Sequence, residues 1–95
     1  MTIQKTLEER GARYGEFADN AEISQILKQT MRSANNWNLL TYAQQEALEM
    51  VQHKISRMLN GDHKYLDNVV DILGYTELMF NDMKGNQRGG KRKMG

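Results

Sequence analysis

The 95-residue sequence contains no cysteine and no proline, and it has no long hydrophobic run. Without cysteine the chain can form no disulfide and offers no thiolate to a metal, which fits a reducing compartment. No apolar stretch approaches the ~20 residues that span a bilayer, and the first ten residues lack the apolar segment of a secretion signal. These absences predict a cytoplasmic protein without a membrane partner, and the length predicts a single domain.

The basic charge is concentrated at one end of the chain. The net charge is +1, but the segment 84–95, KGNQRGGKRKMG, holds five bases and no acid. The remaining residues carry 8 bases and 12 acids, which leaves them with a net charge of −4. Four glycines disfavour a helix in this segment, so a helical domain is expected over 1–84 and a flexible basic tail over 85–95. Such a tail either solubilises the protein or makes a few weak, nonspecific contacts with nucleic acid.

Hydrophobic periodicity and capping signals predict four helices and no strand. The first helix is expected over residues 2–14, with Thr2 as its cap and Gly15 as its stop. The second begins at Asp19 or Asn20, because Asp19 and Glu22 have the spacing of a capping box. Its apolar residues recur at three- and four-residue steps, so it is expected to be amphipathic.

The third helix has the clearest start. Thr41 and Gln44 form a capping-box pattern, and the helix is expected to end near Asn60. Gly61 is expected to supply the left-handed residue that follows many helices. Trp37, in the NNWN turn before this helix, is predicted to fill part of the core.

The fourth helix is expected over residues 64–83, with Asp62 as its cap and Gly85 as its end. The mostly short connections favour antiparallel neighbours. The predicted fold class is therefore all-α, a small four-helix antiparallel bundle-like domain followed by a disordered basic C-terminal tail. About eighty residues build only a marginal core, so a homo-oligomer is expected.

Basic residues border the apolar half of the third helix. At 100° per residue, the predicted core side consists of Ala43, Ala47, Leu48, Met50, Val51, Ile55, Met58 and Leu59. Lys54 lies near its edge, where it either extends its amine into solvent or meets an acid or phosphate in a cleft. His53, Lys54 and Arg57 together can offer one anion a titratable group, a point charge and a planar fork. Glu46 and Glu49 can instead pair with Arg57 and His53 along the helix.

The fourth helix combines an apolar stripe with a face that carries two carboxylates. The predicted core stripe consists of Leu66, Val69, Val70, Ile72, Leu73, Met79, Phe80 and Met83. The second face holds Asp67, Asp71, Gly74, Tyr75 and Leu78. Because a glycine within a helix costs about 1 kcal/mol relative to alanine, Gly74 predicts close approach of another backbone or a ligand. Asp67 and Asp71 are expected in a seam, where they hold a divalent cation or pair with bases of the third helix.

Three segments carry a resemblance to a known group of proteins. The runs RGARYGEF, QQEALEMVQHKISRMLNGD and DNVVDILGY resemble a family of small helical proteins encoded by tailed phages and prophages. The similarity covers roughly residues 7–80. It implies a phage accessory protein acting in the cytoplasm of the bacterial host, and it implies no particular reaction.

The chain is also similar, more weakly, to the MazG-like all-α nucleoside triphosphate pyrophosphatases. These enzymes place E-x-x-E on one helix and E-x-x-D on the next, and the four carboxylates hold magnesium on a triphosphate. Glu46 and Glu49 match the first element, and Asp71 matches the final aspartate. Asn68 stands where the second element has its glutamate, and Asp67 is one residue away. The resemblance implies Mg²⁺ as cofactor and Glu46, Glu49 and Asp71 as metal ligands.

These patterns lead to one main functional hypothesis and two alternatives. The main hypothesis is a cofactor-free binding protein that sequesters a nucleotide or a nucleotide-derived signal in clefts of a helical oligomer. The expected ligand-binding residues are His53, Lys54, Arg57, Asp67, Asp71, Tyr75 and Tyr14, with a tyrosine stacking on the base. One alternative is a magnesium-dependent nucleoside triphosphate pyrophosphatase. The other is a protein-interaction module whose basic tail touches DNA.

Overall fold

The computed structural model describes residues 2–89 of the chain, with side chains described through residue 85. In this part it contains α1 (Ile3–Tyr14), α2 (Phe17–Arg32), the short 3-10 helix η1 (Trp37–Leu39), α3 (Tyr42–Asn60) and α4 (Leu66–Gly89). Residues 2–89 contain no strand, which confirms the predicted all-α class. None of the described helices has the length and hydropathy needed to cross a membrane.

Two of the helix starts follow the predicted capping chemistry. The Thr2 hydroxyl accepts a hydrogen bond from the backbone N–H of Lys5 at 3.1 Å and begins α1. At the start of α3, the Thr41 hydroxyl accepts from the N–H of Gln44 at 3.1 Å. The Gln44 side chain accepts in turn from the N–H of Thr41 at 2.8 Å. Both halves of the predicted capping box are therefore formed.

The predicted start of α2 is wrong. The helix begins two residues before Asp19, at Phe17, and its capping residue Glu16 makes no side-chain capping hydrogen bond. The reason is tertiary: the Glu16 carbonyl accepts from the Asn60 side-chain amide at 3.1 Å as well as from the Asn20 N–H at 3.0 Å. The end of α3 thus fixes the turn between α1 and α2, and a local cap is not needed.

The left-handed conformation predicted for Gly61 is also wrong. Its φ is −126°, and among the described residues only Gly15 has a positive φ, of 80°. Gly61 is needed for space, because a β-carbon there would collide with the backbone of Arg13 and Tyr14. The next residue, Asp62, donates its backbone N–H to the Arg13 carbonyl at 2.7 Å. The glycine therefore allows the ends of α1 and α3 to touch.

Helix α4 differs from its prediction at both ends. It starts at Leu66 because Asp62 caps the preceding turn, where its carboxylate accepts from the N–H of Lys64 at 2.9 Å. It continues through Gly85 to Gly89, so the first residues of the predicted disordered tail are helical. Residues 90–95, which hold most of the basic charge of that tail, lie outside the described part of the chain.

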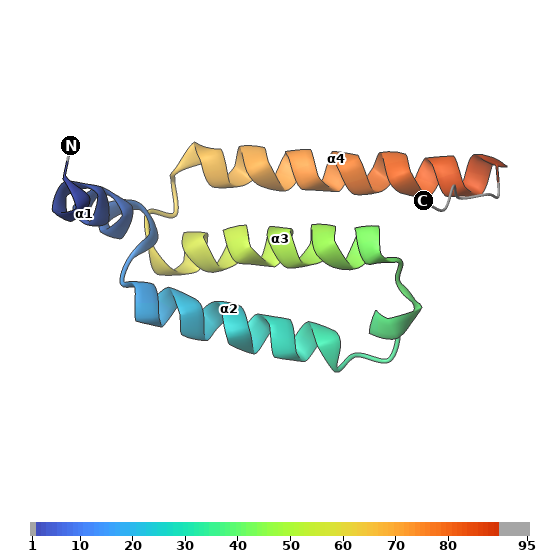
Figure 1. The fold of residues 1–95 in the computed structure, drawn as a ribbon, viewed down its shortest axis with the longest axis horizontal. Coiled ribbons are helices and arrows are strands. Elements are labelled where there is room, and N and C mark those ends of the chain that lie inside the picture. The colour runs from blue at the N-terminus through green and yellow to red at the C-terminus, as the bar shows by residue number, and fades with distance from the viewer. Residues whose placement is uncertain (1, 90–95) are drawn as a thin grey trace.

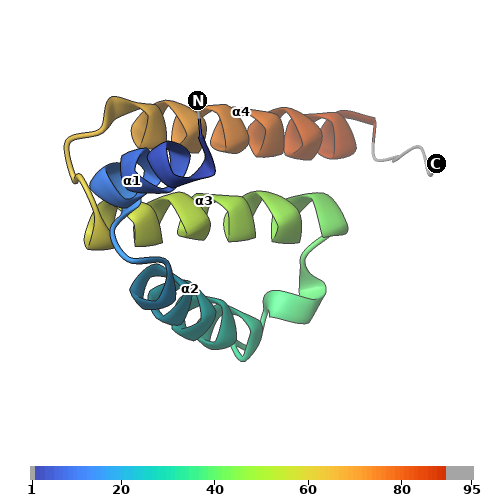
Figure 2. The same ribbon diagram turned by 60° about the vertical axis from the view of Figure 1, so that its left-hand side comes forward.

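Helices α2, α3 and α4 form one layer. They lie side by side and antiparallel, with α3 in the middle (Figure 1). Helix α1 packs against α2 and α3, and the rotated view places it in front of one face of the layer (Figure 2). The predicted antiparallel order of neighbours is confirmed, but a single layer encloses little volume.

The interior of this layer is mostly polar. Among the described residues, the buried apolar set consists of Ala47 alone, whereas six polar or charged residues are buried: Asn20, Ser24, Gln52, Lys54, Ser56 and Asn68. Ser24 and Gln52 join α2 to α3 through hydrogen bonds of 3.2 and 3.4 Å. Leu59 and Phe80, both predicted core residues, are 67% and 59% exposed, and Trp37 is only half-buried. The predicted hydrophobic core of α3 and α4 is therefore largely an open surface.

Candidate ligand site

A cavity of about 450 Å³ lies between the second half of α1, the start of α2 and the last turns of α3. We call it the basic pocket, and its lining consists of Leu7, Arg10, Gly11, Tyr14, Gly15, Glu16, Phe17, Asn20, His53 and Arg57. Three of the predicted ligand residues, Tyr14, His53 and Arg57, therefore meet at one site, although they come from different helices.

The last residue of α3 holds the wall of the basic pocket in place. The Asn60 side-chain amide donates to the carbonyl of Tyr14 at 2.9 Å and to that of Glu16 at 3.1 Å. Gly15, between these two, has a φ of 80° and lies so close to Asn60 that a β-carbon would collide with it. Glycine is the residue that adopts this conformation without strain, so the α1–α2 turn closes tightly on the end of α3.

Two arginines flank the Tyr14 ring inside the pocket. The guanidinium carbon of Arg57 is 4.2 Å from the ring centroid, and that of Arg10 is 5.1 Å from it. Tyr65 meets the same ring edge-to-face, with the two centroids 6.2 Å apart. A cation over an aromatic face is favourable by about 0.5–2 kcal/mol, so Tyr14 fixes the positions of both guanidinium groups.

The cationic groups of the pocket have no acidic partner in residues 2–89. No carboxylate lies within ion-pair distance of Arg10, Arg57 or His53, since the ion pairs formed are Arg32–Glu49 and Lys54–Asp71. The Arg57 Nε and the Asn20 Oδ1 are buried without a hydrogen-bond partner. Buried polar atoms in native proteins are nearly always satisfied, so these two atoms are unusual, as is the Nδ2 of Asn68, which is also unpaired and lies outside the basic pocket.

His53 is harder to protonate in this environment than a fully solvated histidine, because its pKa is lowered. Partial burial lowers the pKa of its imidazole, and the positive charges of Arg57 and Lys54 lower it further. Its ring makes no hydrogen bond with the described residues. An anion in the pocket would offset the positive charges of Arg57 and Lys54. It would therefore raise the pKa of the imidazole and favour its protonated form.

The other predicted ligand residues lie elsewhere. Lys54 pairs with Asp71 across α3 and α4 at 3.0 Å, and its side chain is 11% exposed. This confirms the ion-pair alternative for Lys54 and places it outside the basic pocket. Asp67 is exposed rather than in a seam, and it accepts a hydrogen bond from the Tyr65 hydroxyl at 2.9 Å.

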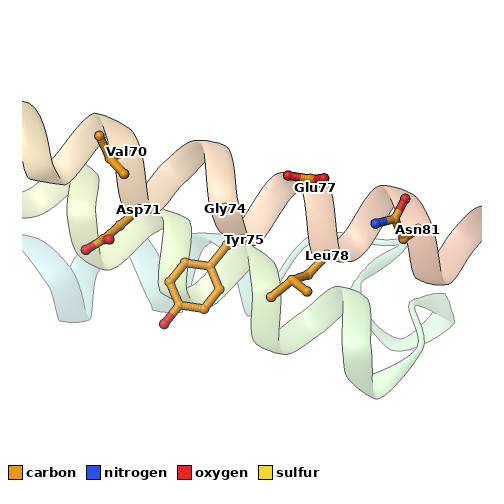
Figure 3. A pocket seen from close by; sticks show the side chains of 7 residues that line it. All are labelled: Val70, Asp71, Gly74, Tyr75, Glu77, Leu78 and Asn81. Carbon is orange, nitrogen blue, oxygen red and sulfur yellow. The ribbon is translucent and has the colours of Figure 1, made fainter.

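Asp71 and Tyr75 line a shallow groove along α4, together with Gly74 and Leu78 (Figure 3). Figure 3 shows that Asp71, Tyr75 and Leu78 point toward α3, whereas Glu77 projects from the opposite edge of the helix. No atom lies within 4 Å of the position that a β-carbon on Gly74 would occupy. The backbone approach predicted at Gly74 is therefore not made by residues 2–89.

The carboxylates of the proposed magnesium site are not gathered together. Glu49 is paired with Arg32 of α2 at 2.8 Å, and Asp71 with Lys54. Glu46 lies with Glu49 in a separate groove beside Trp37. Within residues 2–89, no three histidine or carboxylate side chains are arranged to hold one metal ion.

Sequence reasoning did not predict a place in the pocket for Arg10, Gly11, Glu16, Phe17 or Asn20. Arg10 carries a usable signal, because it stands four residues before Tyr14 and therefore shares its face of α1. Asn20 and Phe17 carry none, since their place in the pocket depends on how the end of α3 fixes the turn at Gly15.

Comparison with protein families gives one match. The model of a domain of unknown function, DUF6378, matches residues 2–82. The chain belongs to the DUF6378 family. Comparisons with curated proteins and with solved structures found no match. The DUF6378 match includes every residue that lines the basic pocket, and its description names neither phages nor pyrophosphatases, so both resemblances stay predictions.

Proposed function

We propose that this DUF6378 chain is a binding protein that holds a nucleotide, or a nucleotide-derived signal, by its phosphate groups in the basic pocket. The observation that carries the proposal is Arg57, which is stacked on Tyr14 with no acidic partner. The protein acts as a homo-oligomer in the cytoplasm and retains its ligand without turnover. In a phage-infected bacterium, as the resemblance implies, such retention would remove a signalling nucleotide from solution.

The chemistry of the pocket fits a phosphate group. A guanidinium presents paired N–H donors that match two phosphate oxygens, and such charge-assisted hydrogen bonds are among the strongest in proteins. Arg10 provides a second guanidinium near the Tyr14 ring. His53 adds a third donor once the phosphate has restored its proton.

The rim of the pocket fits the remainder of a nucleotide. Phe17 is 83% exposed at the start of α2 and lines the same cavity, so its ring is available to stack on a base. The Glu16 carboxylate can accept hydrogen bonds from sugar hydroxyls. A volume of about 450 Å³ lies in the range of small-ligand sites, about 300–1,000 Å³.

The direct test is retention of intact ligand. Purified protein is incubated with mono-, tri- and cyclic nucleotides, with and without magnesium, and repurified, and the ligand released by heat is identified by chromatography. Stoichiometric recovery of an unchanged nucleotide is expected. Binding of none of these nucleotides would refute the proposal. Monophosphate and pyrophosphate formed only with magnesium would favour the enzyme instead, in which case Asp71→Asn should abolish turnover.

A matched pair of variants locates the site. Arg57→Ala is expected to weaken binding tenfold or more, since a hydrogen bond to a charged group contributes about 1.5–3 kcal/mol. Arg32→Ala removes an arginine that is paired with Glu49 outside the basic pocket and should leave affinity unchanged. Equal losses in both variants would show that general charge, and not the pocket, attracts the ligand.

A further inference from the structure

Within residues 2–89, one face of the three-helix layer has no second layer packed on it. Stable domains bury the apolar sides of their helices between at least two layers. Here α1 covers part of one face (Figure 2). At 100° per residue, Leu48, Val51 and Ile55 lie on the opposite side of α3 from His53 and Arg57, and therefore on the other face. We call this the apolar face.

A groove of about 370 Å³ crosses the apolar face between α2, η1 and α3. Its lining contains no charged residue: Met31, Ala34, Asn36, Trp37, Leu40, Leu48, Val51, Gln52 and Ile55. One turn beyond Ile55, Leu59 is 67% exposed. Helix α4 turns further apolar side chains away from α3, namely Leu66, Val69, Val70, Leu73 and Phe80, each at least 38% exposed.

The chain exposes more surface than is expected of a compact monomer of the same mass. A monomer of 11.0 kDa is expected to expose about 5,600 Å², whereas this chain exposes 7099 Å². Its radius of gyration is 16.1 Å, compared with about 12.4 Å for a compact domain of this length.

We propose that the apolar face is covered by the same face of a second copy of this chain. The resulting dimer has two layers of three helices, with the apolar groove and Trp37 between them. The proposed function calls the protein a homo-oligomer without naming an interface, and this proposal goes beyond it by naming one. Neither the surface nor the argument for it depends on the basic pocket, which opens away from the interface.

The chemistry of the face favours a second copy over other occupants. In a two-fold interface each residue near the axis meets its own counterpart, so a charged residue there would face a like charge. The groove has none. Residues 90–95 of the chain are poorly suited to cover the apolar face. Their sequence, GKRKMG, contains three bases and a single large apolar side chain.

The test compares substitutions on the two faces of the full-length protein. The mass at micromolar concentration, from size-exclusion chromatography with light scattering, is expected to be twice 11.0 kDa. Ile55→Glu and Leu59→Glu are each expected to halve it. Leu78→Glu is the matched control, because Leu78 is 65% exposed but lies in the groove with Asp71 and Tyr75. It should remain dimeric.

Trp37 gives an independent signal, since it is the only tryptophan and lines the groove. Its emission is expected to shift to longer wavelength in Ile55→Glu and on dilution, but not in Leu78→Glu. A monomeric wild type, or a dimer that survives both Ile55→Glu and Leu59→Glu, would overturn the proposal. If Ile55→Glu unfolds, as a loss of its helical circular dichroism signal would show, the result of Leu59→Glu decides the test. Leu59 is the more exposed of the two residues, so its substitution disturbs the fold less. Nucleotide retention by a monomeric wild type would refute the dimer and leave the basic pocket standing.

Discussion

The guanidinium carbon of Arg57, near the end of α3, lies 4.2 Å from the centroid of the Tyr14 ring, in the last turn of α1. A guanidinium at this distance over an aromatic ring makes a favourable cation–π contact. No acid of residues 2–89 pairs with this guanidinium. The contact therefore joins α1 to α3 and places an arginine without an acidic partner at the wall of the basic pocket.

Replacing Tyr14 with leucine should weaken nucleotide binding about threefold to thirtyfold, because cation–π contacts contribute about 0.5–2 kcal/mol. The arginine charges remain in this variant, so the loss of affinity measures how much the Tyr14 ring contributes by orienting the arginine side chains. Isothermal titration calorimetry with the retained nucleotide measures the change. Tyr42→Leu serves as control, since Tyr42 is 89% exposed at the start of α3. An affinity unchanged in Tyr14→Leu would contradict the role of the stacked arginines.

His53 should make both folding and binding depend on pH. Its pKa in the folded protein is lowered, chiefly by burial, from an unfolded value of about 6.5. As pH falls below that value, the unfolded chain takes up a proton before the folded chain does, so this contribution to stability is present above about pH 6.5 and lost on acidification. His53→Gln should therefore lose less stability than wild type between about pH 7 and pH 5.5 in urea titrations.

Binding should show the opposite trend at the same residue. A phosphate in the pocket stabilises the imidazolium, so binding takes up a proton and affinity rises as pH falls toward 6. Calorimetry in buffers of different ionisation enthalpy measures that uptake. His63, the other histidine, is exposed in the turn before α4, and His63→Gln should retain both effects. If His53→Gln also retained the proton uptake, His53 would not face the ligand.

The secondary structure could be read from the sequence where local chemistry decides it. Thr2, Thr41 and Gln44 cap their helices through bonds to residues three positions away, and such spacing is visible in a sequence. The start of α2 and the conformation of Gly61 could not be read in this way, because contacts between distant residues fix both. Asn60 holds the Glu16 carbonyl from 44 positions away.

The site was predictable only in part, for a related reason. The sequence places His53, Lys54 and Arg57 within one turn, but α3 has neighbours on both sides. Lys54 turns toward Asp71 of α4, whereas His53 and Arg57 turn toward α1. The prediction of a buried core failed because apolar periodicity marks a face that needs covering, and it does not say whether the same chain or a second copy covers it.

The hydrogen bonds of Asn60 should contribute measurably to stability. Asn60→Ala removes both links to the α1–α2 turn and leaves the carbonyl of Tyr14 without that partner, so a loss of about 1–3 kcal/mol is expected. Chemical denaturation followed by circular dichroism measures it. Asn35→Ala is the control, since Asn35 is exposed after α2. Because Tyr14 and Glu16 line the basic pocket, Asn60→Ala should also weaken nucleotide binding, although Asn60 does not line the pocket.

The pair Lys54–Asp71 should respond asymmetrically to removal of either charge. Lys54 is the buried partner, with 11% of its side chain exposed, while that of Asp71 is 46% exposed. Asp71→Asn leaves an ammonium in a poorly solvated place without its counter-charge and should destabilise the fold by about 1–3 kcal/mol. Lys54→Met keeps most of the volume and removes the charge that needs compensation, so a change within about 1 kcal/mol is expected. Urea denaturation of both single variants and of the double variant gives the coupling energy. If Lys54→Met lost more free energy of unfolding than Asp71→Asn, packing of the lysine side chain against α4, and not its charge, would be the stabilising contact.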